Sequence, residues 1–215
     1  IYVLYISCIS MIANFFYIKP QFFERSPFMS QNIDAFLRVL DATDNSTGGG
    51  TASSVAGAMA GGLAAMVARL SMGKKGLAPR EHYEAIAAEA EELSTALFNG
   101  GHQDAAAFDK VSAAYRLPKD TDDNKAARSR AIQDAMVHAA EVPLANAERC
   151  SRVLELCRSL EKSYNTNAAS DLECAGYLAK AGLKGCIANV KINLPYINDQ
   201  DICKQIQGKL DKIAA

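Results

Sequence analysis

A stretch without a single charged residue, Thr51 to Ala68, follows directly behind three consecutive glycines, Gly48, Gly49 and Gly50. Nearly every residue in it is Ala, Gly, Ser, Val or Met. Ala favours helix, and small side chains let a helix approach its neighbours closely. The glycines leave backbone N–H groups bare where the first donors of a helix have no partners of their own. The pattern predicts a buried central helix whose positive end faces a polar or anionic ligand.

Two other interpretations of this stretch stay open. A glycine loop before a helix is often plain turn chemistry. A membrane span also fits the length, and Gly57 with Gly61 matches the small-xxx-small pattern of packed membrane helices. However, Ala and Gly supply little transfer energy, and no later segment is comparably apolar. We therefore expect a protein that does not engage a membrane.

The composition indicates one domain with a substantial core, since the chain has 215 residues of which 49% are hydrophobic. A net charge of −1 and the absence of Trp argue against a nucleic-acid partner. The six cysteines include no C-x-x-C pair, so we expect neither disulfides nor a zinc site. Cys150 and Cys157 share one helical face and are expected in the core. This cysteine usage predicts a reduced, cytoplasmic protein.

Residues 1–28 differ in character from the rest, being aromatic and β-branched with no Lys or Arg before Lys19. They lack the basic start of a signal peptide, and Met29 is a plausible native start. We expect residues 1–28 to be a non-native or disordered extension, with a membrane anchor as the alternative. Residues 29–215 are then expected to form one helical domain.

Apolar residues at helical spacing recur from Met29 onward, with almost no strand pattern. Pro79 suits the first turn of one helix, and Asn99-Gly100-Gly101 is expected to end it. Another stripe follows over 104–115. We expect the next helix to start at Thr121 and to run towards Pro143, beyond which the stripe continues to residue 160.

The last third of the chain continues this pattern. Ser170 and Glu173 match the capping box S-x-x-E and are expected to open a helix. Residues 202–213 form a clean terminal stripe. The fold class predicted is all-α, a helical bundle around the buried small-residue helix, and such a helix needs more covering surface than a thin bundle provides. We therefore also expect a dimer.

Generic enzyme motifs are absent from the sequence. It contains no P-loop, no G-x-G-x-x-G opening a βαβ unit and no H-E-x-x-H. The histidines at 82, 102 and 138 are scattered, and a lone His is usually a surface or core residue. We expect no metal site.

Four segments in order carry a stronger signal. They read GGGTASSVAGAMAGGLAAMVARLSMGKK, then DAAAFDKVSAAYRLPKDTDDNKAARSRAIQDA, then VPLANAERC, then NTNAASDLECAGYLAKAGLKGCIANVKINL. This series resembles the cyclodeaminase/cyclohydrolase family, over roughly residues 33 to 195. That family comprises stand-alone methenyltetrahydrofolate cyclohydrolases and the C-terminal half of formiminotransferase-cyclodeaminase.

The resemblance implies an all-α homodimer that binds a tetrahydrofolate derivative as substrate, in a cleft near the subunit interface and without a cofactor. The stretch from Ala107 to Ala135 looks most like the cyclohydrolases, which hydrolyse 5,10-methenyltetrahydrofolate to 10-formyltetrahydrofolate. The alternatives are a cyclodeaminase that releases ammonia from formiminotetrahydrofolate, and a non-catalytic helical folate-binding or assembly protein.

Three residues are catalytic candidates, because both reactions move a proton between attacking and leaving groups. Asp104 lies in the segment that resembles the family's D-x-x-x-F element; its alternative role is a carboxylate at a helix start, offsetting the dipole. Asp171 is the rival, although capping explains it as well. Lys119 could meet a substrate carboxylate or polarise the adduct, or could simply be solvated.

The remaining candidates bind substrate. Gly48, Gly49 and Gly50 would offer backbone donors. Asn189 and Asn193 are four residues apart on one helical face, and their amides suit the edge of a pterin, although Asn can also be a buried cap. At the far end of the small-residue helix, Lys74 and Lys75 could hold the glutamate tail of folate, or could be cations at a helix C-terminus.

Overall fold

The computed structural model describes residues 37–43 and 47–214, which fall within one compact unit, residues 32–215. The expected extension, residues 1–28, and the proposed start at Met29 lie outside the described residues. Of the first predicted helical stripe, only residues 37–40 are described, and they are helical.

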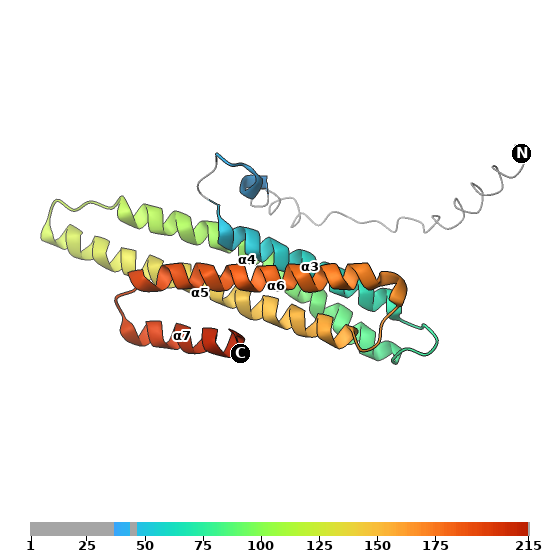
Figure 1. Ribbon diagram of the computed structural model, residues 1–215. Helices are drawn as coiled ribbons and strands as arrows, with labels where there is room; N and C mark the ends of the chain where they lie inside the picture. Colours follow the sequence, from blue (N-terminus) through green and yellow to red (C-terminus); the bar gives the residue numbers. More distant parts are fainter. Residues whose placement is uncertain (1–36, 44–46, 215) are drawn as a thin grey trace, which may run out of the picture. The chain divides into compact units, whose positions relative to one another are not determined.

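Long helices make up the described chain, and no strand occurs within it, which confirms the all-α prediction. Helices α3 to α6 lie side by side along most of their length, and α7 packs against α5 (Figure 1). The helices are α3 (Gly49–Ser71), α4 (Arg80–Tyr115), α5 (Asp122–Leu160), α6 (Ala169–Asn193) and α7 (Gln200–Ala214), with 3-10 turns η1 (Thr166–Ala168) and η2 (Leu194–Tyr196).

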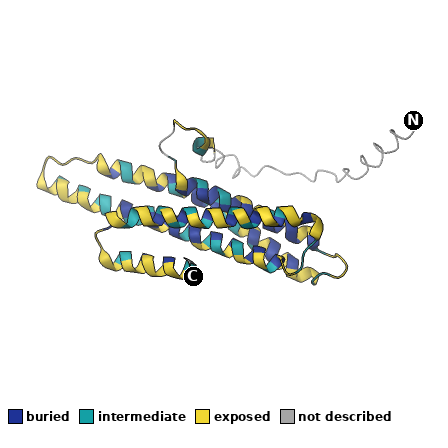
Figure 2. Ribbon diagram, in the orientation of Figure 1, coloured by how far each residue is buried: buried dark blue, intermediate teal, exposed yellow. Residues whose placement is uncertain are grey.

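Helix α3 is the small-residue helix, and it is surrounded by α4, α5 and α6 as predicted. Most of its residues are buried (Figure 2). Neighbouring helices come so close that a Cβ added at Gly61 would lie 2.8 Å from the carbonyl oxygen of Ala90. Among the described helices, only α3 is long and apolar enough to cross a membrane, but 67% of its apolar window is buried inside the bundle. Packing in the core accounts for its composition.

The expected helix end at Asn99-Gly100-Gly101 is wrong, because α4 runs without a break from Arg80 to Tyr115. A glycine that ends a helix usually adopts a positive φ, and among the described glycines only Gly73 and Gly76 do so. Gly100 serves close packing instead: a Cβ there would lie 2.7 Å from Cγ of Asn146 and would overlap its Oδ1. This glycine makes room for a buried side chain of α5.

Helix α5 begins where predicted, with Thr121 as its N-cap: its Oγ1 accepts a hydrogen bond from the backbone N of Asn124 at 3.2 Å. It continues through Pro143, which is buried inside the helix, as far as Leu160. Cys150 and Cys157 are buried in the core as expected.

The predicted capping box at Ser170 is wrong. Helix α6 begins at Ala169, and its N-cap is Ala168, which has no side-chain acceptor. The preceding turn η1 is capped by Asn165, whose Oδ1 accepts from the backbone N of Asn167 at 3.2 Å. Glu173 accepts a hydrogen bond from the Tyr177 hydroxyl instead, at 2.5 Å. The polar group that organises this entry therefore lies five residues upstream of the predicted one.

Candidate active site

A cavity of about 340 Å³ opens where the first turn of α3 meets the C-terminal third of α4, the middle of α5 and the last turns of α6. It brings together five of the residues singled out in the sequence, Gly48, Gly50, Asp104, Asn189 and Asn193. The remaining lining residues are Ala107, Phe108, Val111, Met136, Ala139, Ile192 and Tyr196. Helices adjacent in space but distant in sequence thus converge on one site.

Asp104 is the one carboxylate in this lining. It is partly buried, and its Oδ2 accepts a hydrogen bond from Oγ1 of the fully buried Thr51 at 3.1 Å. Burial raises the pKa of Asp104 above its ordinary value, and the hydrogen bond from Thr51 offsets part of that rise. Such a carboxyl group can take up and return a proton more readily than a solvated one.

The structure excludes the alternative role for Asp104, that of a carboxylate at the start of its own helix. Asp104 lies in the interior of α4, whose own first residue is Arg80. The helix end that faces it belongs to α3. The first intrahelical bond there joins the N of Ala52 to the carbonyl of Gly48, so the preceding N–H groups have no acceptor within the helix. The positive end of α3 therefore borders the cavity, as the glycine pattern predicted.

The glycines at this end act through close contact rather than through unusual backbone angles. Gly48 is extended, with φ of −141°, and neither Gly49 nor Gly50 has a positive φ. A Cβ at Gly50 would lie 2.6 Å from Cγ of Asp104, and one at Gly49 would lie 3.3 Å from Nδ2 of Asn189. Gly50 is thus the position that admits the carboxylate against α3.

Asn189 and Asn193 lie on one face of α6, as their spacing predicted. Asn189 donates to the carbonyl of Gly185 at 2.9 Å. Asn193 donates to the carbonyl of Ala139 on α5 at 2.8 Å and to that of Asn189 at 3.0 Å. These bonds orient both amides. Both residues line the cavity with Asp104, and their Oδ1 atoms accept no hydrogen bond from the described residues.

The walls of the cavity are apolar, and the sequence reasoning did not assign them. Phe108 and Tyr196 are 50% and 57% exposed although aromatic, and Ile192 is exposed beside them. Phe108 lies one turn after Asp104 on the same face of α4 and closes the D-x-x-x-F element, which was the available signal. Nothing in the sequence pattern marked Ile192 or Tyr196.

Four candidates lie away from the cavity. Asp171 is at the start of α6, about 27 Å along the helix axis from Asn189 at 1.5 Å per residue. Lys74 and Lys75 follow the C-terminal end of α3, about 31 Å along its axis from Gly50. Lys119 lies in the connection beyond Tyr115, at least about 16 Å along α4 from Asp104.

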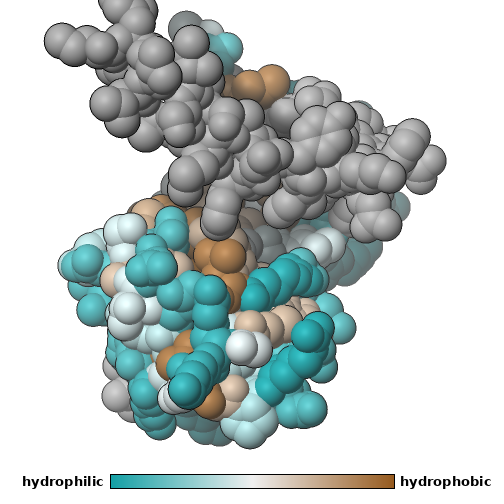
Figure 3. Space-filling view, turned by 90° about the vertical axis from the view of Figure 1, so that its right-hand side faces the viewer, coloured by the Kyte–Doolittle hydropathy of each residue, from teal (hydrophilic) through white to brown (hydrophobic). Residues whose placement is uncertain are grey.

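The end of the bundle that carries Asp171, Lys74 and Lys75 shows mainly hydrophilic side chains with small apolar patches (Figure 3). Both lysines are exposed there. The structure therefore does not bring these three residues to the site, and their predicted roles stay predictions.

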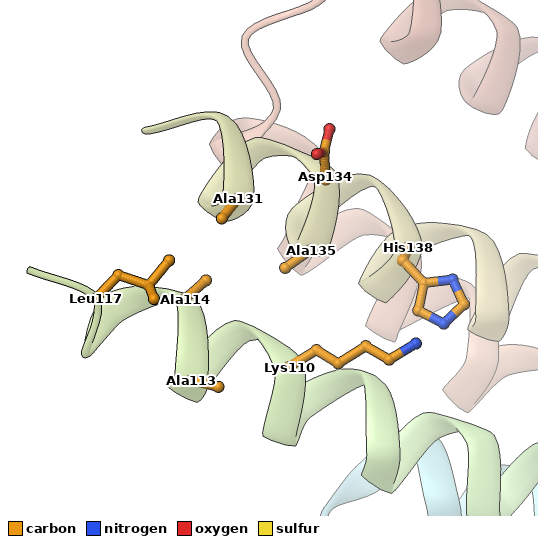
Figure 4. A pocket seen from close by; sticks show the side chains of 8 residues that line it. All are labelled: Lys110, Ala113, Ala114, Leu117, Ala131, Asp134, Ala135 and His138. Atoms are coloured by element: carbon orange, nitrogen blue, oxygen red, sulfur yellow. The ribbon is translucent and has the colours of Figure 1, made fainter. Parts of the chain in front are cut away.

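A second hollow, of about 480 Å³, lies between α4 and α5. Lys110 and His138 extend towards each other at one end of it, and alanines from both helices line the rest (Figure 4). It uses a different face of α4 from the cavity, since Lys110, Ala113 and Leu117 are offset from Asp104, Phe108 and Val111. It contains none of the residues predicted for the site.

Among residues 37–43 and 47–214, no group of three His, Cys, Asp or Glu side chains is placed to hold a metal ion. The site residues described above offer one carboxylate, two amide oxygens and backbone N–H groups. This set suits an organic substrate with N–H donors and positive charge.

Comparison with known proteins shows which family the chain resembles. The family model described as formiminotransferase-cyclodeaminase matches residues 32–212. The chain is 35% identical over 191 residues to a methenyltetrahydrofolate cyclohydrolase of Methylorubrum extorquens, covering 86% of this chain and 92% of that protein. It is 27% identical to the formimidoyltransferase-cyclodeaminase of Sus scrofa, over 92% of this chain but only 37% of the pig protein.

A solved structure extends the likeness to the fold. The crystal structure of a formiminotetrahydrofolate cyclodeaminase from Thermotoga maritima superposes with a TM-score of 0.71 at 31% identity. The match covers 82% of this chain and 84% of that one.

Proposed function

The chain belongs to the formiminotransferase-cyclodeaminase family, and from this we propose that it is an enzyme that hydrolyses 5,10-methenyltetrahydrofolate to 10-formyltetrahydrofolate. The observation that carries the proposal is the position of Asp104: a single carboxylate with a raised pKa, held in a cavity with apolar walls and amide acceptors. The cyclohydrolase relative, which the chain matches over nearly its whole length, favours this reaction.

The reaction asks for one group that moves a proton. In methenyltetrahydrofolate a single carbon bridges N5 and N10 as a cationic amidinium. Asp104 would take a proton from water as its oxygen bonds to that carbon, forming a tetrahedral adduct. Asp104 would then return the proton to N5 as the bond between carbon and N5 breaks, and the hydroxyl of the adduct would release its own proton to solvent, leaving the formyl group on N10. A carboxyl with a raised pKa suits both steps.

Electrostatics supports the same assignment. The substrate carries its positive charge at the reacting carbon, and the Asp104 carboxylate would stabilise that charge in a cavity that partly excludes water. No other charged side chain lines the cavity among the described residues. No cationic side chain of the described lining would therefore compete with the substrate for the Asp104 carboxylate.

The rest of the cavity suits the pterin. A volume of about 340 Å³ accepts a bicyclic ring but not a whole folate, so the remainder of the molecule would extend into solvent. Phe108, Ile192 and Tyr196 offer apolar surface to the ring faces. The Oδ1 atoms of Asn189 and Asn193 could accept hydrogen bonds from the N–H groups at the pterin edge.

The second candidate is the cyclodeaminase reaction, in which N10 attacks the formimino carbon on N5 and ammonia leaves. The same carboxylate would serve it, and the Thermotoga maritima relative bears that name at 31% identity. Both reactions involve proton transfer without redox chemistry, so we expect turnover to survive treatment with EDTA.

We also propose that the protein is a homodimer and that α3 provides the contact. The side of α3 that the other described helices leave open carries Met59, Leu63, Met66 and Leu70 at heptad spacing. Met59 and Leu70 are nearly half exposed. A second copy would cover this stripe; Met66→Glu should then give a monomer in light scattering, whereas the wild type scatters as a dimer.

The decisive experiment follows the loss of methenyltetrahydrofolate absorbance, corrected for the uncatalysed rate, beside an assay for ammonia release from formiminotetrahydrofolate. We expect loss of the first substrate. Ammonia release without hydrolysis would transfer the assignment to cyclodeaminase. Folate binding with neither reaction would indicate the non-catalytic alternative. A cytoplasmic location and the absence of nucleic-acid or membrane partners remain expectations from composition.

A further inference from the structure

Two polar side chains are buried behind the cavity, where the proposed reaction does not use them. Ser54 of α3 and Asn146 of α5 are both fully inaccessible to solvent. Asn146 donates to Oγ of Ser54 at 2.8 Å, and Ser54 donates to the carbonyl of Gly50 at 3.0 Å. Buried amides cost free energy unless they are paired, so a partner for both the nitrogen and the oxygen of Asn146 favours this conformation.

The chain of hydrogen bonds begins at a charge. Arg149, one turn further along α5, donates from Nη1 to Oδ1 of Asn146 at 2.8 Å. A hydrogen bond from an ionised donor is stronger than one between neutral groups, and it fixes which way the amide points. The nitrogen of Asn146 is thereby directed at Ser54.

Asn146 also touches the helix that carries Asp104. The space it fills exists because Gly100 of α4 has no side chain. Gly100 precedes Asp104 by one helical turn, so the contact lies directly behind the carboxylate on the same face of α4. A single side chain of α5 therefore meets α3 through Ser54 and α4 at Gly100.

These contacts converge on the position of one carboxylate. Gly50, whose carbonyl ends the chain of hydrogen bonds, is the residue against which the Asp104 carboxylate lies. Thr51, the next residue, donates to that carboxylate. Resting on the proposed function, we propose that Asn146, held by Arg149 and acting through Ser54, is a positioning residue that sets Asp104 against the first turn of α3.

Helix α3 supplies its own matched control. Ser71, near its other end, is equally buried and also donates to the carbonyl four residues earlier, that of Val67, at 2.8 Å. Like Ser54, it accepts a hydrogen bond from another segment, here from the N of Asn165 at 2.9 Å. Ser71→Ala and Ser54→Ala thus remove equivalent bonds at opposite ends of one helix.

The test compares these two variants for unfolding, kinetics and the titration of Asp104. Both should lose similar stability. Only Ser54→Ala should lower kcat, by about 10- to 100-fold with KM nearly unchanged, since a displacement of about 1 Å at a reacting group can cost ~10²-fold. Asn146→Asp adds an isosteric variant: its carboxylate keeps the partner Arg149 but would draw the Ser54 hydrogen away from Gly50. It should reproduce the kcat loss of Ser54→Ala.

Carbon-13 NMR measures the pKa of the Asp104 carboxyl, and so it detects the same displacement without substrate turnover. Among the described residues, Asp104 is the one charged group of the cavity lining, Tyr196 is the other titratable side chain there, and Thr51 of α3 donates to the carboxylate. Since burial is the main cause of its raised pKa, loosening this contact should bring the pKa down towards the ordinary value in Ser54→Ala and leave it unchanged in Ser71→Ala.

The outcomes separate the two proposals. Equal kcat for the serine variants together with an unmoved Asp104 pKa would overturn the positioning role while leaving the hydrolase assignment intact. An inactive wild type would refute the proposed function, and the titration would still decide whether Ser54 and Asn146 position Asp104.

Discussion

The two ends of α3 differ in how completely their polar groups are paired. At the C-terminal end, Ser71 bonds Asn165, whose side chain in turn donates to the carbonyl of Leu70 at 3.1 Å. Nearby, the buried Tyr83 hydroxyl bonds the carbonyl of Ser163 at 3.1 Å. At the N-terminal end, Asp104 has one side-chain donor, and the amide oxygens of the two asparagines that line the cavity have no hydrogen-bond partner among the described residues.

This contrast favours the N-terminal end of α3 as the functional end more strongly than the distribution of charge does. The C-terminal end carries the cations Lys74 and Lys75, but they are exposed, where water and salt screen their fields. At the N-terminal end, Asp104 is the charged residue of the described cavity lining, and its partial burial strengthens its electrostatic interactions. Incompletely paired polar groups under burial cost stability, and a protein keeps them where chemistry needs them.

The largest effect expected from this contrast is on catalysis. Asp104→Asn keeps the shape of the side chain but removes the proton acceptor, so kcat should fall by ~10²–10⁴-fold. The matched change at the other end, Asp171→Asn, should leave kcat within about threefold of wild type, well inside that range. Steady-state kinetics with methenyltetrahydrofolate measures both. The reverse ranking of the two variants would assign catalysis to Asp171.

A smaller loss of activity is expected from a change at Gly50, where the Asp104 carboxylate approaches α3. A methyl group at Gly50 would collide with Asp104, so Gly50→Ala should reduce kcat by about 10²-fold as the carboxylate is displaced. Gly176→Ala on α6, where a Cβ meets nothing within 4 Å, should keep full activity and gain about 0.5–1 kcal/mol of stability. Equal activity of both variants would show that the close approach at Gly50 is not needed.

A third expected effect is on the free energy of unfolding as a function of pH. Because the folded-state pKa of Asp104 is raised, the folded protein binds this proton more tightly than the unfolded chain. Stability is then full below the ordinary Asp pKa of about 4 and is lost as pH rises through the raised value. Asp104→Asn never ionises, so its advantage in unfolding free energy should grow over that window, to the order of ~1 kcal/mol.

Urea unfolding of wild type and Asp104→Asn at a series of pH values measures this difference, and Asp171→Asn serves as the control. A difference that is independent of pH, or that favours the wild type above the window, would mean that burial does not raise the pKa of Asp104.

The smallest effect is expected at the far end. Replacing Lys74 and Lys75 together by Gln should leave KM within about threefold, because screened surface charges about 31 Å along the helix from the cavity contribute little to binding there. The variants should be titrated with mono- and polyglutamylated substrate. A KM that rises tenfold or more would place the glutamate tail at these lysines and so weaken the contrast between the ends.

Much of the fold follows from the sequence, because apolar spacing reports helices directly. Ala60, Ala64 and Val67 are buried, as the lack of charge in their stretch predicted, and Ile206 and Leu210 of the terminal stripe are buried on α7. Glycine was the main source of error. Gly100 was interpreted as a helix end, since sequence alone does not separate a residue that needs a positive φ from one that needs an empty Cβ position. Only the position of Asn146 decides between them.

The sequence predicted part of the site, and the rest again depends on where segments lie in space. Asp104, Asn189 and Asn193 were found because a family resemblance marked their segments, and the structure brings them together. Lys74 and Lys75 were assigned to the same ligand because they flank the same helix. The rise of 1.5 Å per residue already separates the two flanks of the predicted helix by about 31 Å, and the assignment did not take this length into account. Thr51 and Asn146 went unassigned because a buried polar side chain has no distinct pattern.

The continuous helix α4 has a consequence for how this protein would fail under heat. Active-site residues on loops can melt out locally while the scaffold remains folded. Asp104 has no such freedom, because its backbone lies many residues from either end of α4 and is bonded on both sides within the helix. The geometry around it can be lost only when whole helices separate. Thermal inactivation should therefore coincide with global unfolding, as a single cooperative event.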